Sequence, residues 1–150
     1  MLAGATPVLV HNCGGNSAPF KNDVEGRYSL ADELDAAEVR GVRSVSPGQA
    51  GWEEALNSGV VKWVVDTNEV LHVVPATDDA IKHSIMTRGA PVLAAGEADV
   101  AGAGGMFFGL RISNQSGHYI PCRCSINLGI EKFRQAGINF SPGSVELVGP

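Results

Sequence analysis

Several features that mark other protein classes are scarce or missing in this chain of 150 residues. No apolar run approaches the ~18 residues that a membrane-spanning helix needs. The opening stretch MLAGATPVLV lacks the basic segment that begins a secretory signal peptide. The three cysteines are an odd number, and Cys122 and Cys124 are too close for an unstrained bridge, so no disulfide framework is expected. With 44% hydrophobic and 18% charged residues, the composition indicates a globular domain large enough to bury one core.

The charged residues are unevenly placed along the chain. Residues 13–59 carry four basic and eight acidic side chains, whereas residues 80–134 carry six basic and three acidic ones. The formal net charge of −5 argues against a nonspecific coat on nucleic acid. A local basic cleft in the second half is still compatible with this charge, because electrostatic fields are screened within a short distance.

The first motif is ATPVLVHNC, an apolar strand-like run that ends in His-Asn-Cys. The side-chain amide of Asn12 can attack its own backbone carbonyl and release the downstream chain, with His11 as the acid–base group. An edge strand that ends in an Asn turn is the structural alternative. The string LAGATPVLVHNCG resembles the end of the Hint autocleavage module that precedes the toxin tip in bacterial polymorphic toxins, including Rhs-type proteins. This resemblance makes His11, Asn12 and Cys13 a cleavage junction. The implied domains are 1–12, a remnant of the upstream module; 13–28, a linker; and 29–150, the toxin domain.

The pattern after the linker predicts helices first and then a mostly antiparallel sheet, with one late helix. Ser29 is a suitable N-cap for the first helix. Asp66, Thr67 and Asn68 are turn residues between two β-branched runs, which is typical of a hairpin. This order of elements is an α+β pattern. Helices are expected at 30–42, 52–58 and 125–135, a hairpin at 60–74, and further strands at 91–100, 106–113 and 144–148.

Two segments contain the residue types that acid–base chemistry requires. The segment KHSIMTRGAPVLAAGE has His83 and Ser84 just before a strand, and ISNQSGHYIP has His118 and Tyr119 just after one. Glu97 is expected at the end of the strand between them. If the two strands are neighbours, these side chains converge on one face or rim of the sheet.

Such a set of side chains suits the cleavage of RNA. One group removes the 2′-OH proton, another protonates the leaving 5′-oxygen, and a cation stabilises the phosphorane. Arg88 and Arg111 are the candidate cations, because a guanidinium matches the geometry of a phosphate. Ser116 and Gly117 complete the expected substrate-binding set. This reaction needs no metal and no other cofactor.

Each of these residues also has a structural interpretation. The SGHY stretch can be a turn in which His118 caps backbone groups. His83 can be a helix-end or loop residue, and Glu97 an exposed carboxylate at a strand end. His72 alternates with Leu71 along a strand and is expected to be structural. The residues alone leave these alternatives open.

The order of motifs resembles a polymorphic-toxin family related to the C-terminal region of plant IQ-motif calmodulin-binding proteins. The order is HSIMTRGAPVLAAGE, a Gly-rich turn, ISNQSGHYIP and a helix that ends near AGINF, over about residues 60–140. The resemblance implies a metal-independent ribonuclease with a barnase/EndoU/colicin/RelE-like fold. No IQ-type motif is present, so calmodulin is not expected as a partner. The matching residues are His83, Ser84, Gly117, His118, Tyr119 and Pro121.

The role of Glu97 as a base does not come from this resemblance, because the relatives often have a basic residue after AAG. Three other functions also fit parts of the sequence. An ADP-ribosyltransferase would use NAD and take Glu146 as its acid, although the Arg/His strand and Ser-Thr-Ser segment of that class are not evident. A zinc deaminase needs His-x-Glu and Cys-x-x-Cys ligands, whereas this chain has Cys-x-Cys and Ala95 two residues before Glu97. A non-catalytic binding module is the last alternative.

The combined expectation is the tip of a secreted antibacterial toxin that cleaves RNA in the cytoplasm of a target bacterium. A cognate immunity protein and an upstream delivery protein follow from the toxin class. No membrane partner is expected.

Overall fold

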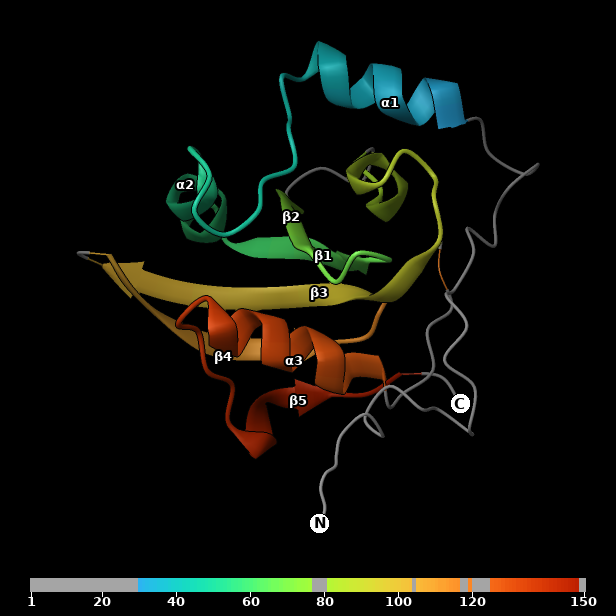
Figure 1. Ribbon diagram of the computed structural model, residues 1–150. Helices are drawn as coiled ribbons and strands as arrows, with labels where there is room; N and C mark the ends of the chain where they lie inside the picture. The colour runs from blue at the N-terminus through green and yellow to red at the C-terminus, as the bar shows by residue number, and fades with distance from the viewer. Residues whose placement is uncertain (1–29, 77–80, 104, 117–118, 120–124, 149–150) are drawn as a thin grey trace.

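The computed structural model describes residues 30–76, 81–103, 105–116, 119 and 125–148. The elements follow the predicted order of early helices, strands and a late helix (Figure 1). They are α1 (Leu30–Val39), α2 (Trp52–Asn57), β1 (Val60–Asp66), β2 (Leu71–Pro75), η3 (His83–Met86), β3 (Val92–Ala103), β4 (Met106–Ser113), α3 (Ile126–Gln135), η5 (Pro142–Ser144) and β5 (Val145–Glu146).

The five strands form one sheet in the order β2-β1-β3-β4-β5. Neighbouring strands are antiparallel except β4 and β5, which run parallel. This mostly antiparallel sheet, with helices before it and one late helix, confirms the predicted α+β class. In the described part of the chain, every helix is too short or too polar to cross a lipid bilayer.

The predicted hairpin is confirmed, and its turn is built by Asp66. The carboxylate oxygen Oδ1 of Asp66 accepts hydrogen bonds from the backbone N–H groups of Asn68 at 2.8 Å and Val70 at 3.0 Å. An aspartate that binds the backbone two residues ahead mimics a backbone turn. Glu69 completes the reversal with a left-handed φ of 63°.

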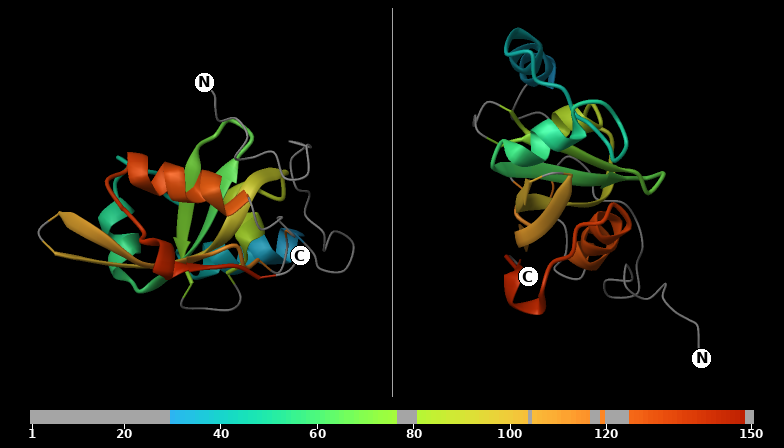
Figure 2. Two further views of the ribbon diagram at one scale, coloured as in Figure 1. Left: turned by 90° about the horizontal axis from the view of Figure 1, so that it is seen from below. Right: turned by 90° about the vertical axis from the view of Figure 1, so that its left-hand side faces the viewer.

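Apolar side chains on opposite faces of the sheet form two buried clusters. In the first cluster, Trp63 and its neighbours pack against α2 and α3. In the second, Val64 and its neighbours pack against α1 and η3. Trp63 and Val64 are consecutive in β1, so their side chains point to opposite faces. The ribbon views accordingly show α1 and α3 on opposite sides of the sheet (Figures 1 and 2).

Two glycines allow close packing around the fully buried Trp63. A Cβ atom on Gly129 of α3 would lie 2.3 Å from Cη2 of Trp63. A Cβ atom on Gly96 of β3 would lie 2.9 Å from Cζ2 of the same ring and 1.7 Å from the carbonyl oxygen of Ser113. The helix and the strand therefore approach this indole at a distance that only glycine permits.

Glycine also sets the helix ends. The first helix ends before the predicted residue 42, because Gly41 adopts a left-handed φ of 67° and the N–H of Val42 donates to the carbonyl of Ala37 at 2.9 Å. This is the C-terminal arrangement that glycine favours. Gly137, with a φ of 88°, ends α3 as predicted.

β3 is longer than the strand predicted at 91–100. It continues to Ala103, which pairs with Met106, so the turn to β4 is tighter than expected. The expectation that Glu97 lies at a strand end is therefore wrong. Glu97 lies in the middle of β3, with β1 on one side and β4 on the other.

Candidate active site

The two motif segments pack against each other through Tyr119, which is fully buried. Its hydroxyl donates a hydrogen bond to the carbonyl oxygen of Ala90 at 2.8 Å and lies 3.1 Å from Oγ1 of Thr87. Its backbone N–H donates to Oγ of Ser116 at 3.1 Å. Burial raises the pKa of Tyr119, against the opposing hydrogen bond with Thr87, and the nearby carboxylate of Glu33 raises it further. Tyr119 is therefore a protonated donor that joins the segments.

His83 is 3% exposed and lies at the start of η3, over the sheet. Its Nε2 donates to the carbonyl oxygen of Gly96 on β3 at 2.7 Å. This bond fixes the ring next to Glu97, the following residue of β3. Because a carbonyl oxygen only accepts, Nε2 of His83 carries the hydrogen of this bond.

Ser84 is also fully buried, and its hydroxyl donates to the Glu33 carboxylate at 2.6 Å. Glu33 is a buried residue of α1, so this bond attaches η3 to the first helix. A hydrogen bond from a hydroxyl to a carboxylate is shorter and stronger than a hydrogen bond between two neutral groups. The contact gives Ser84 a structural role.

Glu97 and Arg111 form the partly exposed part of the candidate site. A guanidinium nitrogen of Arg111 on β4 lies 3.9 Å from a carboxylate oxygen of Glu97, and another lies 3.7 Å from Glu146 on β5. The side chains of Glu97 and Arg111 are 26% and 31% exposed, and that of Glu146 is 55% exposed. Arg111 is thus bracketed by two carboxylates on a water-accessible part of the sheet surface that β3, β4 and β5 share.

Sequence reasoning missed Lys62, which faces Glu97 across the β1–β3 pair. Lys62 is a buried residue whose amine donates to the backbone carbonyl of Ile81. A lysine inside the apolar run VVKWVVD was the available signal, because lysine is rarely buried without a partner. Lys62 thus places a positively charged residue on β1, directly across from Glu97 on β3.

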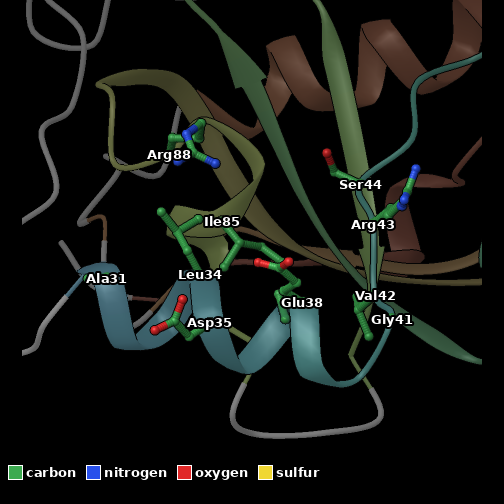
Figure 3. A pocket seen from close by; sticks show the side chains of 11 residues that line it. Ala31, Leu34, Asp35, Glu38, Gly41, Val42, Arg43, Ser44, Ile85 and Arg88 are labelled. Atoms are coloured by element: carbon green, nitrogen blue, oxygen red, sulfur yellow. The ribbon is translucent and has the colours of Figure 1, made fainter.

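Arg88 lies elsewhere, beside a cavity of ≈ 600 Å³ between α1 and the segment that follows η3 (Figure 3). It is an exposed residue with a left-handed φ of 54°. The same cavity is lined by Arg43, Asp35 and Glu38, so both signs of charge are present. In the described part of the chain, Arg88 lines this cavity and Arg111 does not, so the two candidate cations serve different surfaces.

Several predicted residues lie outside the described residues. They include His118 and Gly117, so the expected convergence of His118 with His83 and Glu97 stays a prediction. The cleavage junction and the domain division at the N-terminus also lie outside the described residues, so they stay predictions. Within the described ranges, no three His, Cys, Asp or Glu side chains gather as a metal site would require. The site residues concerned are His118, Gly117, His11, Asn12 and Cys13.

A comparison of the chain with protein-family models, curated proteins and solved structures finds no match.

Proposed function

We propose that this chain is a metal-independent ribonuclease that forms the tip of an antibacterial toxin. The observation that supports the proposal is the pair formed by Glu97 and Arg111 on adjacent strands, with the side chains 3.9 Å apart and both partly open to water. A carboxylate and a guanidinium side by side provide a proton acceptor and a cation that matches phosphate. His83 and Tyr119 hold the surrounding segments in place.

In the proposed reaction, Glu97 accepts the proton of the ribose 2′-OH. The 2′-oxygen then bonds to phosphorus while Arg111 stabilises the developing negative charge. The bond from phosphorus to the 5′-oxygen breaks, and the leaving oxygen takes a proton from His118. The products are a 2′,3′-cyclic phosphate and a free 5′-OH.

The chain connection makes this assignment of His118 feasible. Ser113 pairs with Glu97 across the β3–β4 ladder. His118 follows five residues later, and five residues span at most ~17 Å. This upper limit on the chain span is compatible with a contact between His118 and a phosphate bound at Arg111.

The test is degradation of total RNA by the purified protein in EDTA without NAD. Glu97→Gln and His118→Ala are each expected to lower the cleavage rate by ~10²–10⁴, the usual contribution of a general acid or base. Glu131→Gln is the matched control, because Glu131 is a carboxylate bonded to Arg134 on the exposed face of α3. Intact RNA with the folded wild type would contradict the ribonuclease proposal, and full activity in either variant would remove that residue from the mechanism.

An NAD-dependent ADP-ribosyltransferase is the second candidate, because Glu146 on β5 lies 3.7 Å from the same guanidinium. The two proposed functions use different carboxylates around Arg111, so one experiment can distinguish between them. Transfer of label from NAD to a macromolecule, lost in Glu146→Gln and kept in Glu97→Gln, would establish the transferase. Cleavage of RNA with the opposite pattern would establish the ribonuclease.

A further inference from the structure

A second group of polar side chains lies around β2, an edge strand of the sheet. Nδ1 of His72 is 3.2 Å from Oγ of Ser46, and Nε2 of His72 is 2.7 Å from Oδ2 of Asp66. A hydroxyl, an imidazole and a carboxylate are thus joined in series, within the distances of a nucleophile–base–orienter arrangement. None of these residues belongs to the ribonuclease site proposed above.

The hydrogen bonds determine the direction in which protons are donated. Burial tends to raise the pKa of Asp66, but the hydrogen bonds from His72 and from the N–H groups of Val70 and Asn68 outweigh it and lower the pKa. Asp66 is therefore ionised and accepts the Nε2–H of His72. In the neutral ring Nδ1 is then the acceptor, so the hydroxyl of Ser46 donates to it.

Ser46 also lines a cavity of ≈ 230 Å³ beside the C-terminal end of α3. Val70, Leu71 and Ala136 give this cavity apolar walls, and Lys132 gives it a cation. Nζ of Lys132 is 3.6 Å from the carboxylate of Glu69. The cavity has room for a short acyl group and for one charged contact.

Holding the loop in place does not require the bond between Ser46 and His72. The neighbouring residue Val45 forms two backbone hydrogen bonds with Val73, at 2.9 and 2.8 Å, which attach the loop to the edge of β2. The backbone N–H of Ser46 is bonded separately to the side chain of Gln49 at 2.9 Å. The side chains of Ser46 and His72 are therefore available for a task other than anchoring.

We propose that Ser46 is the nucleophile of an esterase site, with His72 as its base, Asp66 as the orienting carboxylate and small carboxylic esters with a short acyl group as substrates. Oγ of Ser46 bonds to the carbonyl carbon while its proton passes to Nδ1 of His72. Lys132 is the cation available to the oxyanion. The ester C–O bond breaks, the leaving alkoxide takes the proton from His72, and water then hydrolyses the acyl-serine to the acid.

The probe is an alkyl fluorophosphonate, for which labelling is read by intact mass and by peptide mapping. The Oγ–P bond forms, the P–F bond breaks, fluoride leaves and the serine proton passes to His72. We expect one equivalent of label on Ser46 in the wild type and none in Ser46→Ala. Ser58→Ala is the control and should label like the wild type, because the hydroxyl of Ser58 bonds only to the carbonyl of Ala55 in the described structure.

A second variant separates catalysis from structure. Asp66→Asn keeps a carbonyl oxygen for the backbone N–H groups of Asn68 and Val70 but offers an NH₂ group to His72. The ring must then place its hydrogen on Nδ1, so it cannot accept the serine proton, and labelling should slow by ~10²-fold or more. An unlabelled wild type, a label on another residue, or equal rates in Asp66→Asn would each overturn the proposal.

The ribonuclease and esterase sites can fail independently. Ser46→Ala is expected to cleave RNA like the wild type, and Glu97→Gln is expected to label like the wild type. Loss of labelling in Glu97→Gln would contradict a separate esterase site.

Discussion

At the residue scale, the buried polar side chains around η3 are satisfied by specific partners. Ser84 donates to Glu33, His83 donates to the carbonyl of Gly96, and Lys62 donates to that of Ile81. Leaving one buried partner unsatisfied costs about 1–3 kcal/mol. These bonds therefore fix the position of the HSIM segment over the sheet.

Asp66 makes the stability of the fold depend on pH at the acid end. Burial tends to raise its folded-state pKa, but the hydrogen bonds with His72, Val70 and Asn68 hold this pKa below the ordinary value of 3.8. The stabilisation is therefore present above the unfolded-state pKa and is lost as the pH falls through the folded-state pKa. The wild type should unfold at higher urea concentration than Asp66→Asn near neutral pH, and this difference should shrink below about pH 4. A difference that stays constant down to about pH 3 would contradict the hydrogen bonds assigned to the Asp66 carboxylate.

At the scale of elements, local sequence signals predicted the structure correctly where a short segment determines its own geometry. The hairpin follows from the turn that Asp66 makes with its own neighbours, and the end of α3 follows from Gly137. The full length of β3 could not be predicted from the sequence. The Ala/Gly-rich stretch after Val100 has low strand propensity and is held in the sheet by its pairing with β4.

The contact between α3 and the sheet depends on Gly129. Gly129→Ala places a methyl group 2.3 Å from Trp63, a fully buried ring that also packs edge-on against Phe133. Overpacking of this kind costs about 1–3 kcal/mol, which is expected as a lower melting temperature and free energy of unfolding. Gly143→Ala is the matched control, because nothing lies within 4 Å of its added Cβ. Equal stability of the two variants would show that α3 can shift away without cost.

At the scale of the whole molecule, sequence periodicity predicted the fold class but not the contacts between distant segments. The parallel pairing of β4 with β5 places Glu146 next to Arg111. No local sequence pattern predicts this pairing. In the same way, the loop containing Ser46 reaches His72, 26 residues away, by lying along the edge of β2. The sequence pattern identified His83, Glu97 and Tyr119 as candidate site residues, and the partners of these side chains come from distant segments.

The functional domain is expected to begin after the His-Asn-Cys motif. The two core clusters and the sheet of the described structure are formed by residues 37–146. Removal of residues 1–12 is therefore expected to leave the melting temperature and the RNA-cleaving activity unchanged.

In a longer chain that carries the complete upstream module, Asn12→Ala should block release of the domain, because alanine has no side-chain amide to close the succinimide. Mass spectrometry of the released fragment reports the new N-terminus. Release in the Asn12→Ala chain with Cys13 still at that terminus would show that the His-Asn-Cys motif is not a cleavage junction.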